Sequence, residues 1–111
     1  MAGHAKERLA EINSRALNLF KADGQTMSAF RGLLGAATRE GRISLGIKEL
    51  VAVSIAVARG CEDCIVYHVN EAKVHGASRD ELIELLAIAV EMSGGPGTVY
   101  AGKALAAFDE L

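Results

Sequence analysis

The apolar residues at the start of the chain recur with a helical period. Two segments carry them at intervals of three, four and seven residues with charged residues between, which is typical of helices with one apolar face. The pattern predicts helices over residues 5–22 and 26–40, ended by Asp23-Gly24 and by Gly41. We expect the two helices to form an amphipathic hairpin whose role is packing. Their apolar positions are Leu9, Ile12, Ala16, Leu19, Phe20, Met27, Phe30, Leu33, Leu34 and Ala37.

The segment from Ser44 to about Arg59 has a different pattern, because its apolar residues surround the helix instead of forming a stripe. A helix that is apolar all round is a buried one, and Ser44 is a suitable N-cap. Many of these residues are β-branched, so a strand is the alternative. We favour a helix because no other segment offers a strand to pair with. The apolar residues are Leu45, Ile47, Leu50, Val51, Val53, Ile55, Ala56 and Val57.

The second half of the sequence predicts three more helices separated by glycine. Gly60 interrupts the apolar run, and a fourth helix is expected from Cys61 to Gly76. The run Ser78-Arg79-Asp80-Glu81 is a capping box that opens a fifth. Gly94-Gly95-Pro96 separates it from a last helix that ends near Asp109. We therefore expect a single all-α domain of about six helices spanning residues 1–111.

The composition is compatible with a packed helical domain that also forms an oligomer. Half of the 111 residues are apolar, so the chain can form a core without disulfide bonds. Aromatic residues are few and tryptophan is absent, which makes Ala, Val, Leu and Ile the core residues. Small side chains at this density favour close helix packing and leave room for a homo-oligomer to complete the burial.

The charge and the apolar runs argue against several classes of function. A net charge of -2 and a pI near 5.9 provide no basic stripe for nucleic acid. The first residues are charged and lack the apolar stretch of a signal peptide. The longest apolar run, Leu50 to Ala58, is about half of what a bilayer requires. We therefore expect a cytoplasmic protein without membrane association, and in that reducing compartment a Cys-x-x-Cys pair indicates redox chemistry or metal binding.

The two cysteines of the chain lie at the start of the fourth predicted helix. They are Cys61 and Cys64, and His68 follows one turn later. Residues at this spacing share one helix face. A thiol reacts as the thiolate, which is favoured by the helix dipole at Cys61 and by the imidazole near Cys64. These arguments do not choose the attacking sulfur, and the alternative is a pair of small buried residues without chemistry.

Glu49 is a lone acid in the apolar third segment. A carboxylate in such surroundings must be paired, protonated or functional, and it is a candidate proton relay. The alternative is a salt bridge to Arg42 or Arg59. Together with the two cysteines and His68 it could also supply four metal ligands. Structural zinc sites usually use a second Cys-x-x-Cys or paired histidines, so we expect no metal and no cofactor.

The other polar residues of the fourth helix are expected to be structural. Tyr67 should point away from His68 and serve in packing or in an interface. Glu71 is expected on a solvated face, and His75 lies at the helix C-terminus, where the dipole favours a cation. Asp63, between the cysteines, suits the first turn of the helix.

The order Glu49, Cys61, Cys64 and His68 resembles the carboxymuconolactone decarboxylase family, and in particular its alkylhydroperoxidase AhpD-like branch. The combination is more specific than a Cys-x-x-Cys pair alone. The similarity covers about residues 27–108 and includes Lys48-Glu49-Leu50, His75-Gly76-Ala77 and the capped helix from Ser78 that Gly94-Gly95-Pro96 follows.

The resemblance implies an all-α fold that assembles into homo-oligomers, commonly trimers or hexamers. It also implies a thiol peroxidase cycle in which Cys64 attacks a hydroperoxide and becomes a sulfenic acid, which Cys61 resolves as a disulfide. Glu49 and His68 would form the proton relay, and an external dithiol would reduce the disulfide. One position differs. The best-studied sites of this type have a second histidine where this chain has Asp63, and a negative charge disfavours a nearby thiolate.

Three other functions remain open at this point. A thioredoxin-like reductase also has Cys-x-x-Cys at a helix start, but that fold needs strands and usually a cis-proline, and Pro96 is the only proline. A non-catalytic assembly protein or a thiol-based redox sensor fits the small-residue composition. A carboxymuconolactone decarboxylase-like lyase is the third, although those members usually lack the cysteine pair.

Overall fold

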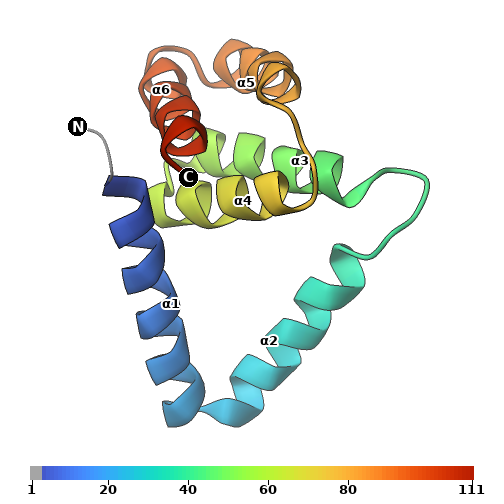
Figure 1. Ribbon diagram of the computed structural model, residues 1–111, viewed down its shortest axis with the longest axis vertical. Coiled ribbons are helices and arrows are strands. Elements are labelled where there is room, and N and C mark those ends of the chain that lie inside the picture. The colour runs from blue at the N-terminus through green and yellow to red at the C-terminus, as the bar shows by residue number, and fades with distance from the viewer. Residues whose placement is uncertain (1–3) are drawn as a thin grey trace.

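The computed structural model describes residues 4–111, and this range contains helices and no strands (Figure 1). The predicted all-α fold is confirmed. No helix of the described range is long and apolar enough to cross a membrane. The elements are α1 (His4–Ala22), α2 (Gly24–Ala37), α3 (Leu45–Arg59), α4 (Glu62–Val74), α5 (Arg79–Ser93) and α6 (Gly95–Glu110).

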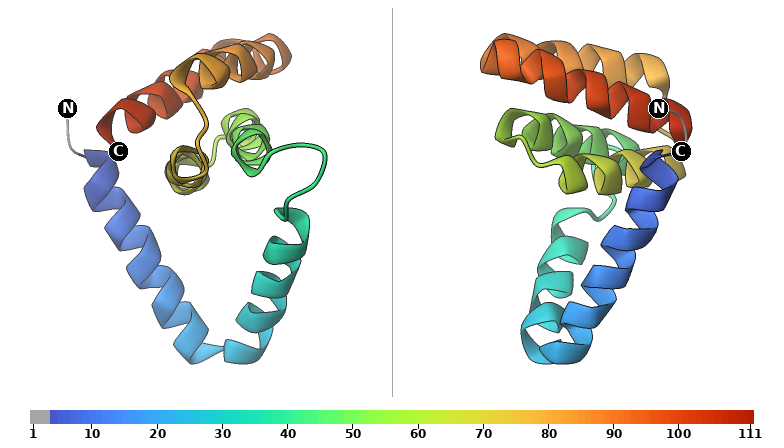
Figure 2. Two further views of the ribbon diagram at one scale, coloured as in Figure 1. Left: turned by 45° about the vertical axis from the view of Figure 1, so that its right-hand side comes forward. Right: turned by 90° about the vertical axis from the view of Figure 1, so that its left-hand side faces the viewer.

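The helices form three tiers, which the two views of Figure 2 separate. Helices α5 and α6 lie side by side on one face of the α3–α4 pair, and α3 packs against α4, α5 and α6. Helices α1 and α2 meet at Asp23 and diverge, so that they form a V on the opposite face of α3 and α4 (Figure 1). The core therefore lies between α3, α4, α5 and α6.

The core consists of aliphatic side chains, as the composition predicts. Each of its largest fully buried side chains contributes about 1.5–3 kcal/mol relative to an exposed position. One prediction about α3 is wrong, because Val51 and Ile55 are 45% and 55% exposed. They line an apolar face with Ile88 and Met92 of α5. The fully buried side chains are Leu50, Val53, Val57, Ile65, Val69 and Leu82.

The hairpin of α1 and α2 does not pack as predicted. Within Gly24–Ala37 no residue is buried, and in α1 only Ala5 is. Leu33, which the sequence pattern places on the packing face, is 65% exposed. The start of α1 is held on the core by a hydrogen bond from the Ala5 amide to Glu110 Oε1 at 2.9 Å. Leu9 and Ile12 of α1 pack against the core, whereas the apolar side chains nearer the apex of the V and along α2 border an open space.

The helix ends follow the capping residues of the sequence. Ser44 caps α3, and Ser78 and Glu81 form the predicted capping box of α5, with both hydrogen bonds present. The second helix ends at Ala37, before the predicted residue 40. The C-cap is Thr38, whose backbone amide and hydroxyl both donate to the Leu34 carbonyl, the hydroxyl at 2.7 Å. The helix therefore ends four residues before Gly41, the stop that the sequence predicts.

Gly46 lies at a close contact that predicts a stability effect. A Cβ at this position would lie 2.9 Å from the carbonyl oxygen of His75 and 3.2 Å from the amide nitrogen of Ala77. We expect Gly46→Ala to destabilise the protein by about 1–2 kcal/mol, because backbone must move to admit the methyl group. Denaturant unfolding measures it, with Gly32→Ala in α2 as the matched control. Nothing lies within 4 Å of a Cβ at Gly32, so alanine there should stabilise by about 0.5–1 kcal/mol. If both substitutions changed the free energy of unfolding equally, the close approach of Gly46 to the backbone of His75 and Ala77 would not limit the residue at this position.

Candidate functional site

The turn between α3 and α4 positions the cysteine pair. Gly60 adopts a left-handed conformation with φ 70°, which a residue with a side chain rarely adopts. This turn delivers Cys61 in an extended conformation as the N-cap of α4. The helix therefore begins at Glu62 and ends at Val74, one residue inside its predicted start and two inside its predicted end.

Cys61 and Cys64 form a disulfide, with their Cα atoms 5.3 Å apart. The sulfur of Cys61 also accepts a hydrogen bond from the Cys64 amide at 3.3 Å, as an N-cap side chain does. The two sulfurs differ in access, since Cys64 is exposed and Cys61 is half-buried. The structure thus holds the oxidised form, with Cys64 as the accessible member.

Glu49 and His68 form a pair behind the disulfide. The Oε1 atom of Glu49 lies 2.6 Å from Nδ1 of His68. Glu49 is 5% exposed, and the side chain of His68 is 21% exposed. The alternative salt bridge of Glu49 to Arg42 or Arg59 is wrong, because His68 is the partner. With Nδ1 engaged by Glu49, Nε2 is the ring nitrogen that can exchange a proton with its surroundings.

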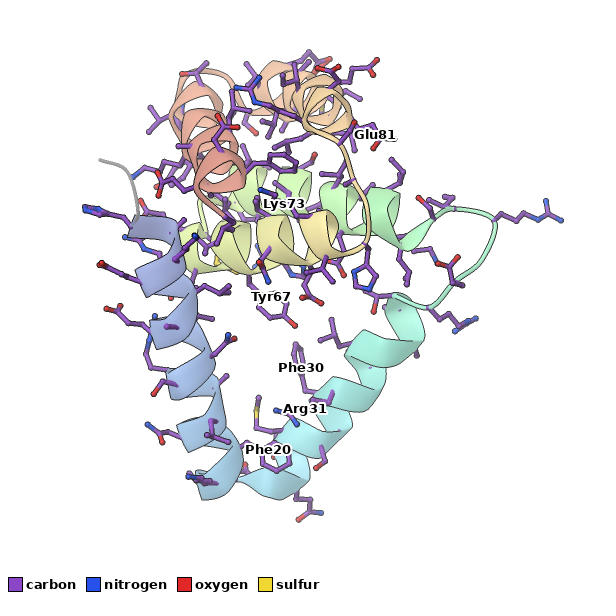
Figure 3. The ribbon with its side chains drawn as sticks, in the orientation of Figure 1. Phe20, Phe30, Arg31, Tyr67, Lys73 and Glu81 are labelled. Carbon is purple, nitrogen blue, oxygen red and sulfur yellow. A yellow bond between two sulfur atoms is a disulfide. The ribbon has the colours of Figure 1, made fainter. Side chains whose placement is uncertain are left out.

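An apolar groove of about 610 Å³ opens between the V of α1 and α2 and the exposed side of α4. Figure 3 shows Tyr67 of α4 and Phe30 of α2 pointing toward each other across this space. Cys64 and His68 belong to its α4 wall, whereas Cys61 does not line it. The lining residues are Ile12, Asn13, Ala16, Leu17, Phe20, Met27, Phe30, Arg31, Leu34, Asp63, Cys64, Tyr67 and His68.

Tyr67 is a residue of this groove that the sequence reasoning missed. It was expected to point away from His68, but its ring meets the His68 ring edge to face, with centroids 5.0 Å apart. Burial raises the pKa of Tyr67, and the negative charges of Glu71 and Glu49 raise that pKa further. The charge of Arg31 acts on the same pKa in the opposite direction. A position next to His68 on the helix was the only signal in the sequence.

The two acids between the cysteines hold neighbouring helices. Asp63 pairs with Arg15 of α1 at 3.0 Å. Glu62 pairs with Arg8 of α1 and, at 2.7 Å, with Lys103 of α6. The hydrogen bond from Lys103, followed by that from Arg8, lowers the pKa of Glu62. The sequence contained a signal for these pairs, since Arg8 and Arg15 are seven residues apart and share a face of α1.

The remaining candidates of α4 are structural. His75 is the C-cap, and its Nδ1 atom lies 2.8 Å from the Glu71 carbonyl oxygen, so it belongs to the helix end as predicted. In residues 4–111 no group of three or more His, Cys, Asp or Glu side chains could hold a metal ion.

Fold and site define a class of protein. It is an all-α domain with an accessible Cys-x-x-Cys pair at a helix start and a buried carboxylate–imidazole pair behind it. The sequence model of the carboxymuconolactone decarboxylase family matches residues 24–107, and the chain belongs to that family. The AhpD-like branch suggested by the cysteine pair is consistent with this assignment.

Two uncharacterised proteins are similar to this chain over most of its length. An uncharacterised protein of Cupriavidus necator is 49% identical over 111 residues, which are 100% of this chain and 98% of that protein. An uncharacterised protein of the cox locus of Paracoccus denitrificans is 35% identical over 75% of each chain.

Two crystal structures of the family share the fold. The apo form of a family protein from Legionella pneumophila superposes with a TM-score of 0.94 at 36% identity, covering 98% of this chain and 97% of that one. A family protein from Thermotoga maritima, for which a part in the antioxidative response has been suggested, superposes with a TM-score of 0.78. It is 29% identical and covers 92% of this chain and 87% of that one.

Proposed function

We propose that the protein is a thiol-dependent peroxidase that reduces hydroperoxides through Cys64 and Cys61. The observation that carries the proposal is the Glu49–His68 pair at 2.6 Å, whose histidine shares one groove wall with Cys64. A nucleophile beside a histidine that a buried carboxylate orients is the arrangement by which proteins activate thiols. Membership of the family, and the antioxidative role suggested for the Thermotoga maritima relative, support the same reading.

The first step oxidises Cys64. In the reduced protein, Nε2 of His68 takes the thiol proton while Glu49 holds the ring through Nδ1. The thiolate attacks the terminal peroxide oxygen, a sulfur–oxygen bond forms and the oxygen–oxygen bond breaks. Cys64 becomes a sulfenic acid, and the alkoxide that leaves takes the proton from His68 and departs as an alcohol.

The second step closes the disulfide and the third reopens it. The Cys61 sulfur, as a thiolate, attacks the sulfur of the sulfenic acid, and hydroxide leaves with a proton as water. Cys61 is suited to this role, because its sulfur already lies at the N-cap of α4, where the helix dipole favours negative charge. An external dithiol then returns two electrons and two protons and is itself oxidised to a disulfide.

Thiol titration coupled to peroxide consumption tests this proposal. We expect the reduced protein to show both thiols, and one equivalent of tert-butyl hydroperoxide to remove both within the monomer. With dithiothreitol supplied, peroxide consumption should be catalytic. Turnover no faster than that of free cysteine would overturn the peroxidase and leave a thiol-based redox sensor as the better description.

Asp63 and Arg15 predict an electrostatic effect on Cys64. The Asp63 charge next to Cys64 disfavours the thiolate, and Arg15 at 3.0 Å compensates it. In a Cys61→Ser background, we expect Arg15→Gln to slow alkylation of Cys64 by iodoacetamide about two- to fivefold, the range of an exposed ion pair. Asp63→Asn should accelerate alkylation. With asparagine in place, Arg15→Gln should have no effect. The measurement is the alkylation rate of Cys64 against pH in the Cys61→Ser parent, the two single variants and the double variant. Identical rates in all four proteins would contradict the compensation of the Asp63 charge by Arg15.

We also propose that the chain forms a homo-oligomer, as the resemblance implies. The supporting observation is the exposed apolar face of α3 and α5, where Ile88 and Met92 are 59% and 75% exposed. A second copy that covers this face would bury it. Sedimentation of the protein at several concentrations tests it, and a monomer throughout would refute it.

A further inference from the structure

The groove is larger and more apolar than the peroxide group requires. Its volume of about 610 Å³ lies in the range of small-molecule sites, about 300–1,000 Å³, whereas a water-sized oxidant occupies about 30 Å³. The walls away from α4 are mainly Ile12, Leu17, Phe20, Met27 and Leu34. Such walls favour a long hydrocarbon chain over a small, water-like peroxide.

A single cation faces this apolar space from α2. The guanidinium of Arg31 lies over the Phe20 ring, 4.5 Å from its centroid, and Figure 3 shows both near the apex of the V. Within residues 4–111 Arg31 has no acidic partner among the ion pairs. Stacking on an aromatic face leaves the edge of the guanidinium available, and that edge matches a carboxylate.

The other charged groups around the groove are accounted for. Asp63 is paired with Arg15, and His68 is engaged by Glu49. Arg31 lines the same groove as Tyr67 of α4, so its charge lies on the groove side of α2. The groove thus has a reactive sulfur on the α4 wall, a cation toward the apex and apolar side chains between them (Figure 3).

We propose that the groove binds the hydroperoxide of a long-chain carboxylate, with the carboxylate at Arg31, the hydrocarbon along α1 and α2, and the hydroperoxyl group at Cys64. This inference rests on the proposed function for its chemistry and names the substrate class of that site. The reaction is the one already described: Cys64 supplies two electrons to the peroxide and an external dithiol restores them. Charge complementarity at Arg31 distinguishes this ligand from a neutral hydroperoxide of the same length.

The test compares substrates that differ only in charge or length. For the wild-type protein we expect kcat/KM for linoleate hydroperoxide to exceed that for its methyl ester by about three- to tenfold, the contribution of one charge-assisted contact. Arg31→Gln should remove this difference through KM, and Arg31→Lys should retain part of it. Arg39→Gln is the matched control, because Arg39 lies beyond the end of α2, bonds the Ala36 carbonyl and does not line the groove.

A binding measurement separates this inference from the peroxidase. Oleate, which carries no peroxide, should bind the disulfide form in calorimetry below its micelle concentration, and Arg31→Gln should weaken that binding about three- to tenfold. If tert-butyl hydroperoxide is reduced but oleate does not bind, the inference is overturned and the peroxidase stands. If oleate binds and no peroxide is reduced, the ligand site stands without the peroxidase. If the wild-type protein does not bind oleate and Phe30→Glu dissociates an oligomer, the groove is an interface with a second copy, and the inference is overturned.

Discussion

Replacement of Cys64 with serine is expected to abolish catalytic peroxide consumption. The Cys64 thiolate is the group that attacks the peroxide in the proposed cycle, and a serine hydroxyl at this position has no redox chemistry. We expect a loss of at least about a thousandfold, to the level of the free dithiol reductant. The measurement is the rate of peroxide loss with dithiothreitol present. An unchanged rate would refute the proposed function.

Cys61→Ser is the matched variant for this prediction, because it removes the other sulfur of the same disulfide. Without added dithiol it should react once with peroxide and stop, since no thiol is present on α4 to resolve the sulfenic acid. Trapping with dimedone should label Cys64 in this variant and nothing in Cys64→Ser. If the two variants behaved in the reverse way, Cys61 would be the attacking residue despite its lower exposure.

Replacement of Glu49 with glutamine is expected to reduce kcat/KM about a hundredfold while the fold persists. The amide oxygen can still accept a hydrogen bond from Nδ1 of His68, so the ring keeps its place. The glutamine side chain, however, has no negative charge to stabilise the imidazolium that forms when His68 takes the thiol proton. Single-turnover oxidation of the reduced protein, followed by loss of thiols, measures this effect directly.

Three comparisons make the Glu49 prediction specific. Glu84→Gln removes an exposed carboxylate of α5 and should change nothing. His68→Asn should cost about as much as Glu49→Gln, and the double variant should lose little more, because residues that act as a unit are not additive. The melting temperature of Glu49→Gln should shift by only a few degrees, since the buried oxygen keeps a partner. A large loss of stability with normal oxidation kinetics would make Glu49 a structural residue.

Much of the fold could be predicted from local features of the chain. Ser44, Gly60 and the Ser78 capping box mark helix ends within a residue or two, because capping depends on side chains that lie next to the backbone they satisfy. The error at Ala37 has the same origin, since Thr38 caps α2 before Gly41 is reached. The three- and four-residue spacing on α4 likewise predicted that Cys64 and His68 share one face, as the groove confirms.

By itself, the sequence determined which residues form the helices, which residues are the candidates for the chemistry, and that an acid within an apolar helix needs a partner. Only the tertiary structure decided that His68 is this partner. Glu49 and His68 are nineteen residues apart in the sequence, and their contact depends on how α3 packs against α4. The tertiary structure also decided that α1 and α2 diverge, that Arg15 neutralises Asp63, and that Tyr67 lines the groove. These features arise between helices, where the crossing and spacing of whole elements set the distances, and the periodicity of a single helix contains no information on them.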